Sequence, residues 1–202
     1  MSKVLELYKN ILESNQRFVD EVFENEEYRA AVPQLTIIDL GAYEGEFSFY
    51  CYNFAKKIYA IEADPRPYKI LAKRIKKYEL DRIKSFPIAL SGSRGKRIFH
   101  ASGYGGSRLL ESEQELSGES DIKVDSMSLA QFMAENNIDH VDILKVDIEQ
   151  GEDEVFNAPD FKDVVGKIDL IIGEHLLSVD GLLKDFGFEA KTDGINTVYQ
   201  KI

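Results

Sequence analysis

Residues 36–48 read TIIDLGAYEGEFS, and this stretch decides the fold of the chain. It opens with a short apolar run that ends at Leu40, which is typical of a strand buried on both faces of a parallel sheet. Gly41 and Gly45 then allow a tight turn and the close approach of a ligand, and aromatic residues follow at helical spacing. The order of strand, glycine turn and helix predicts an open α/β sheet whose ligand lies beyond the carboxyl ends of the strands.

The same turn can be compared with the dinucleotide fingerprint G-x-G-x-x-G. That fingerprint needs glycine at the position of Tyr43, because its second glycine lets the backbone approach a pyrophosphate. Tyr43 therefore argues against a dinucleotide site. By itself, the spacing of Asp39, Gly41 and Gly45 leaves two interpretations open: a site for a nucleotide-like ligand, or a tight turn with a structural role only.

Length and composition are those of one ordinary globular domain. The chain has 202 residues, of which 44% are hydrophobic and 30% charged, which suits one buried core and leaves no room for a second full domain. No apolar run reaches the length of a membrane span, and the amino terminus lacks the apolar core of a signal peptide. These features predict a cytoplasmic protein with no membrane partner.

The net charge of -11 disfavours nucleic acid as a partner, because phosphates repel an acidic surface unless the basic residues are segregated. One basic run is present within residues 69–77, and its members are Lys69, Lys73, Arg74, Lys76 and Lys77. We interpret this run as the solvated face of a helix and keep RNA binding as an alternative.

A second strand, residues 57–64, carries Glu62 and Asp64 at its end. Glu62 falls 21 positions after Gly41. At a spacing of roughly 20 residues, an acid at the tip of the neighbouring strand can accept hydrogen bonds from both hydroxyls of a ribose. The alternative is a lone surface acid, but spacing and position together favour a ribose site.

The rest of the chain alternates strands and helices. Strands are predicted at residues 83–90, 98–100, 122–124, 141–147 and 168–173, a terminal hairpin at 188–201, and helices at 3–28, 65–80, 128–136 and 182–186. This alternation predicts an α/β fold with a doubly wound, mostly parallel sheet. The helix before the first strand either caps the ligand cleft or packs on the sheet edge. The glycine-rich residues 103–107 either bind substrate or turn the chain, and residues 111–121 are expected to form a loop.

Five stretches occur in the order of a known family: Asp39-Leu40-Gly41-Ala42, Ile61-Glu62-Ala63-Asp64-Pro65, Ala89-Leu90-Ser91, Leu144-Lys145-Val146-Asp147-Ile148-Glu149 and Glu174-His175. Over about residues 35–188 they resemble the FkbM-type S-adenosylmethionine-dependent methyltransferases. The resemblance implies a seven-stranded sheet with the last strand antiparallel. We therefore expect a methyltransferase domain at residues 34–202, preceded at residues 1–33 by the N-terminal helix as a cap. The resemblance also implies S-adenosylmethionine as cofactor and O-methyl transfer to a hydroxyl of a small-molecule or glycan acceptor.

The resemblance assigns roles to single residues as well. The turn that begins at Gly41 would pass under the methionine part of the cofactor, and Glu62 would hold the ribose diol. Ala89 would line the adenine pocket, and Asp147 would stand near the methyl group. The implied cofactor-binding residues are Asp39, Gly41, Ala42, Tyr43, Glu44, Gly45, Phe47, Glu62, Ala63, Ala89 and Asp147.

Two positions depart from the usual pattern of the family. Tyr43 stands where asparagine is usual, and Gln150-Gly151 stand where glycine-alanine is usual. The first concerns the methionine pocket and the second the acceptor loop. Two alternatives therefore stay open: an RNA methyltransferase on the same sheet, and a protein that binds S-adenosylmethionine without transferring its methyl group.

Acids and one histidine at two strand ends suit the chemistry of methyl transfer. This reaction is an in-line displacement on a sulfonium, so the protein mainly aligns the reactants and accepts a proton. His175 is the best conventional base, because imidazole ordinarily titrates near neutral pH. The predicted catalytic residues are Asp147, Glu149, Glu174 and His175.

The same four groups would alternatively form an oxygen-rich site for a magnesium-like ion. No local ligand spacing specifies an ion, so no metal is predicted. His100 and His140 have no evident partner in the sequence and are interpreted as structural.

Overall fold

A computed structural model describes residues 35–102, 107–110, 120–174, 176–193 and 196–202. The predicted cap at residues 1–33, most of the glycine-rich stretch at 103–107 and most of the loop at 111–121 lie outside these residues, so the predictions for them stay predictions. None of the described helices is long and apolar enough to cross a bilayer.

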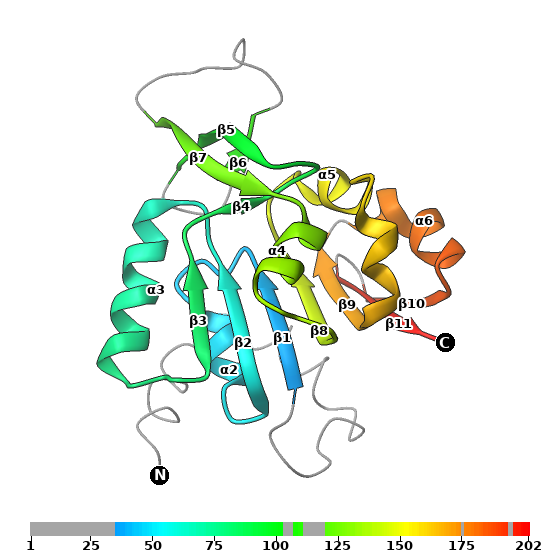
Figure 1. The fold of residues 1–202 in the computed structure, drawn as a ribbon, viewed down its shortest axis with the longest axis horizontal. Coiled ribbons are helices and arrows are strands. Elements are labelled where there is room, and N and C mark those ends of the chain that lie inside the picture. The colour runs from blue at the N-terminus through cyan, green and yellow to red at the C-terminus, as the bar shows by residue number, and fades with distance from the viewer. Residues whose placement is uncertain (1–34, 103–106, 111–119, 175, 194–195) are drawn as a thin grey trace.

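The main sheet is built from seven strands: β1 (Leu35–Leu40), β2 (Ala55–Ile61), β3 (Ile83–Phe86), β8 (Val141–Val146), β9 (Ile168–Glu174), β10 (Phe188–Asp193) and β11 (Asn196–Lys201). They lie in the order β10-β11-β9-β8-β1-β2-β3 (Figure 1). β11 runs antiparallel to both of its neighbours, whereas all other neighbouring pairs are parallel. The predicted doubly wound, seven-stranded sheet with an antiparallel last strand is confirmed.

Both faces of this sheet are buried, which is why its central strands read as continuous apolar runs. Successive side chains point to opposite faces: Ile37 and Ile143 join one hydrophobic cluster, and Ile38 and Leu144 join the other. The first cluster packs under α2 (Glu46–Cys51) and α3 (Pro65–Lys77). The second packs under α4 (Leu129–Glu135), α5 (Glu152–Phe156) and α6 (Asp180–Asp185).

Short helices and caps complete these layers. Asp64 caps α3 by accepting a 2.9 Å hydrogen bond from the backbone N–H of Arg66, and Pro65 follows as a compatible first residue. Ser128 and Gln131 form a capping box at α4. The remaining helical turns are the 3-10 helices η3 (Phe161–Asp163), η4 (Val165–Lys167) and η5 (Leu176–Val179).

A second, four-stranded sheet lies beyond the carboxyl ends of the main strands (Figure 1). It consists of β4 (Ala89–Leu90), β7 (Asp121–Met127), β5 (Gly95–His100) and β6 (Arg108–Leu109), in that order. The sequence predicted the cores of β5 and β7 but not their assembly into a sheet. The strand predicted at residues 83–90 is interrupted: Pro87, which in the sequence indicates an edge or an irregularity, lacks the N–H that a ladder requires, so the chain leaves the main sheet after Phe86 and β3 is its edge strand.

Candidate active site

The turn after β1 is pressed against the end of β8 and cannot accept a side chain at Gly41. Gly41 has φ +78°, and a Cβ placed on it would lie 1.7 Å from the carbonyl oxygen of Asp147. Gly45 has φ +102°, and a Cβ there would lie 2.5 Å from the ring of Phe49. Both glycines are therefore required by left-handed backbone and by close packing. Contacts within the protein therefore fix the shape of the turn.

Glu62 joins this turn to the end of β2. Its two oxygens accept backbone hydrogen bonds from Tyr43, at 2.8 Å, and from Asp64, at 2.6 Å. Burial raises the pKa of Glu62 to about 7, although both hydrogen bonds act to lower it. The carboxylate is thus oriented from two sides and sits beside the glycine turn, as the ribose prediction requires.

Asp39 is fully buried at the end of β1. Its Oδ2 accepts a 2.6 Å hydrogen bond from the hydroxyl of Ser48, on α2. Its Oδ1 lies 3.4 Å from the ammonium of Lys145. Asp39 therefore connects β1, the helix after the turn, and β8.

Lys145 is the residue that the sequence prediction missed. Its ammonium donates a 2.8 Å hydrogen bond to the carbonyl of Gly41 and lies 3.4 Å from Asp147 Oδ2 as well as from Asp39. Burial opposes the charge, but the two carboxylates raise the pKa of Lys145 above its usual value. A usable signal was present, because a lysine two residues before Asp147 in a buried apolar strand faces the same side as that acid.

The turn after β8 presents a cluster of acids at the carboxyl edge. The Asp147 side chain is 47% exposed, while its backbone N–H donates a 3.0 Å hydrogen bond to Leu40. Glu149 is exposed, whereas Glu152 is buried and accepts a 3.3 Å hydrogen bond from the N–H of Ile148. Burial, together with the charges of Asp147 and Glu149, raises the pKa of Glu152. Asp147 is thus an accessible carboxylate, and Lys145 connects it to the carbonyl of Gly41 in the glycine turn.

The end of β9 lies next to the end of β8. Val146 pairs with Gly173 in the parallel register, so Asp147 and Glu174 follow paired residues on neighbouring strands. The backbone of Glu174 is described, but its side chain and the whole of His175 are not. The predicted catalytic roles of Glu174 and His175 therefore stay predictions.

The other predicted cofactor residues line the β1 turn or a small apolar cluster above it. Ala89 is buried in a cluster with Phe99 and Val124, and Ala63 packs against this cluster. This arrangement is compatible with the predicted adenine wall. Ala42 and Phe47 are buried in the core under α2 and α3, and Glu44 forms a 2.8 Å ion pair with Arg74.

A comparison with known proteins identifies the family. The Methyltransferase FkbM domain matches residues 39–189, which is most of the chain. The chain belongs to this family. No curated protein matches the chain in sequence.

Solved structures of methyltransferases share the fold. Methyltransferase FkbM from Methylobacillus flagellatus KT is 15% identical with a TM-score of 0.53, and the match covers 86% of this chain and 46% of that one. TrmK of M. capricolum, solved in complex with S-adenosyl-homocysteine, is 15% identical with a TM-score of 0.51, covering 91% and 67%. An rRNA methylase from Streptococcus thermophilus is 7% identical with a TM-score of 0.50, covering 87% and 91%. At these identities the likeness shows the fold alone, and the chain spans less than half of the M. flagellatus chain.

Both departures of this FkbM methyltransferase from the family pattern lie at left-handed residues. Tyr43 has φ +48° and Gln150 has φ +71°. Asparagine and glycine, the residues expected at these positions, adopt left-handed backbone more easily than tyrosine and glutamine do. Both turns therefore hold left-handed backbone at residues with a bulky side chain, a conformation that costs energy.

His100 and His140, which have no evident partner in the sequence, each lie beside a carboxylate in the structure, and their interpretation as structural stays a prediction. His100 Nδ1 lies 2.8 Å from Asp121 Oδ1 across the β5–β7 pair. His140 Nε2 lies 3.0 Å from Asp169 Oδ2 and 3.6 Å from Asp142 Oδ1. The contacts of His100 with Asp121 and of His140 with Asp169 join different strands, so sequence spacing could not reveal them, whereas Asp142 lies only two residues after His140.

Proposed function

We propose that this FkbM methyltransferase binds S-adenosylmethionine at the carboxyl edge of the main sheet and methylates a hydroxyl of a small molecule or sugar. The observation that carries the proposal is the fixed Glu62 carboxylate, which accepts two backbone hydrogen bonds beside a glycine turn that no side chain can enter. A carboxylate oriented in this way can accept hydrogen bonds from a ribose diol without reorganising.

Each part of the cofactor has a proposed partner at this edge of the sheet. Glu62 would hold the ribose, the Gly41 turn would pass beside the methionine part, and Ala63 and Ala89 would wall the adenine. The cofactor would supply an electrophilic methyl group on a sulfonium. The carboxylates of Asp39, Glu62 and Asp147 would favour that cation by their charge.

Asp147 is proposed to accept the proton of the acceptor hydroxyl. Its carboxylate is exposed at the strand end, and the buried ammonium of Lys145 fixes its position at 3.4 Å. Lys145 is a positioning residue, because it contacts Asp147 and the Gly41 carbonyl from the buried side. Glu149, Glu174 and His175 are proposed to complete the acceptor side. The acceptor and the cytoplasmic location stay predictions.

Calorimetry with S-adenosylmethionine and S-adenosylhomocysteine tests the cofactor. We expect both to bind, and Glu62→Gln to weaken binding about tenfold or more through loss of a charged acceptor. Absence of binding by both compounds would overturn the proposal.

Transfer is tested with isotope-labelled cofactor, cell extract and mass spectrometry of the labelled product. Asp147→Ala should abolish transfer while leaving the far-ultraviolet circular dichroism spectrum unchanged. Asp163→Ala, at an exposed acid on η3, is the matched control and should keep full activity. Full activity of Asp147→Ala would show that another group accepts the proton, and binding without transfer to any compound would favour a non-catalytic role.

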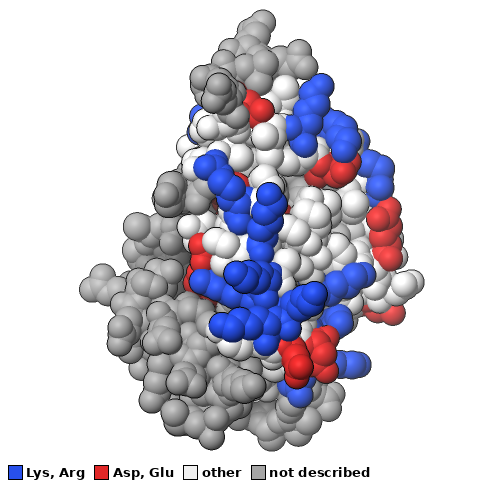
Figure 2. Space-filling view, turned by 90° about the vertical axis from the view of Figure 1, so that its left-hand side faces the viewer, with Lys and Arg blue, Asp and Glu red and all other residues white. Residues whose placement is uncertain are grey.

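An RNA acceptor is the second candidate, because one face of this acidic protein is basic. Figure 2 shows Lys and Arg side chains gathered on the face that carries α3. The helix α3 contains no acid. Of its basic residues, Arg74 pairs with Glu44 and Glu46, and Arg66 lies 3.7 Å from Asp64. The exposed members are Arg66, Lys69, Lys73, Lys76 and Lys77. Binding of a single-stranded RNA at low salt that weakens in Lys69→Glu/Lys73→Glu would favour this acceptor, and absence of such binding would remove it.

A further inference from the structure

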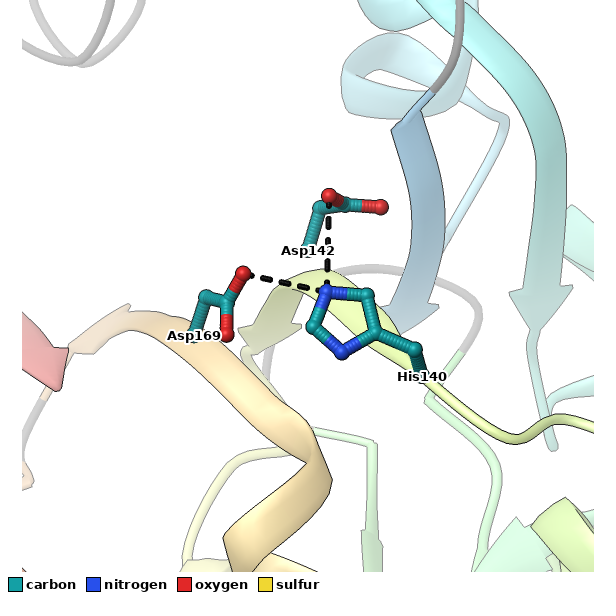
Figure 3. A group of neighbouring side chains, drawn as sticks. All are labelled: His140, Asp142 and Asp169. Atoms are coloured by element: carbon teal, nitrogen blue, oxygen red, sulfur yellow. Dashed lines mark ion pairs between the residues drawn. The ribbon is translucent and has the colours of Figure 1, made fainter.

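Three metal-binding side chains meet at the amino edge of the main sheet, opposite the candidate active site. His140 directly precedes β8, Asp142 is the second residue of β8, and Asp169 is the second residue of β9. Figure 3 shows one imidazole nitrogen of His140 facing both carboxylates. All three ligand atoms lie within 4.8 Å of one another.

The distances suit one shared ion. His140 Nε2 lies 3.0 Å from Asp169 Oδ2 and 3.6 Å from Asp142 Oδ1. Ligand atoms at about 2.05 Å from a tetrahedral zinc ion are about 3.3 Å apart, so the two distances bracket that separation. Small shifts of exposed side chains would bring all three atoms into the first coordination sphere.

The backbone prepares Asp142 for this role. Its Oδ2 accepts a 2.7 Å hydrogen bond from the backbone N–H of Thr36, on β1, which leaves Oδ1 directed at His140. A hydrogen bond to the second oxygen is how proteins orient a carboxylate ligand. The parallel register also sets Asp142 beside Asp169 on the neighbouring strand, and adjacent like charges favour a cation between them.

We propose that His140, Asp142 and Asp169 form a zinc site that ties the start of β8 to the start of β9, with water at the fourth position. The mixed imidazole and carboxylate set suits Zn²⁺, whereas Mg²⁺ prefers oxygen ligands alone. The site lies at the other end of the strands from Asp147, so it stabilises the sheet and takes no part in methyl transfer.

His100 supplies a matched comparison within the same chain. It also pairs with a carboxylate, Asp121 at 2.8 Å, but no other carboxylate of the described residues completes a three-ligand group there. One imidazole beside one carboxylate supplies two ligand atoms only. The second carboxylate at His140 is what distinguishes the proposed site.

The test is calorimetric titration of the tag-free full chain with zinc chloride at about pH 7.5. We expect one equivalent to bind, at least tenfold weaker binding in His140→Ala and in Asp169→Asn, and unchanged binding in His100→Ala. Zn²⁺ should also raise the melting temperature of the wild type and of His100→Ala but not of His140→Ala.

Two results would overturn the proposal. One is a wild-type protein that binds zinc no more tightly than His140→Ala, and the other is an equal loss in His100→Ala. Circular dichroism of each variant establishes that it is folded. Asp147 and Glu149 form another acidic group, at the carboxyl edge, and Asp147→Asn tests whether zinc binds there instead. This variant should keep the stoichiometry and affinity of the wild type.

Discussion

The two edges of the main sheet carry similar charged groups in opposite surroundings. At the carboxyl edge, Asp39 is 0% and Lys145 8% exposed, and both are fixed by further hydrogen bonds. At the amino edge, the side chains of His140 and Asp169 are 50% and 59% exposed. Buried pairs are costly to break because each partner loses its water on folding, whereas exposed pairs exchange with water at little cost. The carboxyl edge is therefore rigid, and the amino edge keeps its ligand atoms available.

The largest difference between the edges should appear at Gly41. Gly41→Ala places a Cβ 1.7 Å from the Asp147 carbonyl at a left-handed residue, so the two strand ends must separate. We expect a loss of about 5 kcal/mol or more of unfolding free energy, enough to unfold many small domains. Urea denaturation measures this loss. Gly181→Ala is the control, since nothing lies within 4 Å of its added Cβ, and it should change stability by less than about 1 kcal/mol.

The second comparison removes one charge at each edge. Lys145→Met leaves the buried Asp39 carboxylate without its cation, which should cost about 3 to 4 kcal/mol. Asp169→Asn breaks an exposed pair and should cost less than about 1 kcal/mol in metal-free buffer. Denaturation of both variants in the presence of a chelator measures the difference. Equal costs would contradict the assignment of a rigid and a permissive edge.

Sequence predicted the parts of this molecule that depend on local pattern. The apolar runs predicted β1, β2 and β8, the alternation of strands and helices predicted a doubly wound sheet, and together they placed Asp39, Glu62 and Asp147 at the carboxyl edge. The second sheet was not predicted, because β4 and β6 have only two residues each and acquire meaning only by pairing. Asp39 and Asp169, which contact Lys145 and His140, come from other strands and could not be paired with them from the sequence, whereas Asp147 and Asp142 each follow two residues later on the same stretch of chain.

The pH dependence of stability should sharpen the description of the carboxyl edge. The pKa of Glu62 is raised from 4.5 to about 7 in the folded protein, mainly by burial. Between these values the folded protein holds more protons than the unfolded chain, so stability must fall as pH rises through this window. The expected loss is on the order of 2 kcal/mol.

The variant Glu62→Gln isolates this effect, since the pKa values of Glu46 and Glu152 are raised by burial as well. We expect the variant to show a smaller fall of unfolding free energy between about pH 4.5 and 7. In the wild type, cofactor affinity should instead increase as pH rises through about 7, since ribose hydroxyls donate to the ionised carboxylate. A slope unchanged by Glu62→Gln would place the titrating group elsewhere.

The smallest expected effect tests whether the backbone at Gln150, in the turn after β8, is strained. Gln150 is exposed and has φ +71°, a conformation that costs a residue with a Cβ roughly 1 kcal/mol. Gln150→Gly should therefore raise the unfolding free energy by somewhat less than this amount, because glycine also gains entropy in the unfolded chain. Gln150→Ala keeps the Cβ and should leave the strain in place. If alanine stabilised the protein as much as glycine, the benefit would come from loss of the glutamine side chain and not from relief of the backbone. If neither variant were more stable than the wild type, the left-handed backbone at Gln150 would not be strained.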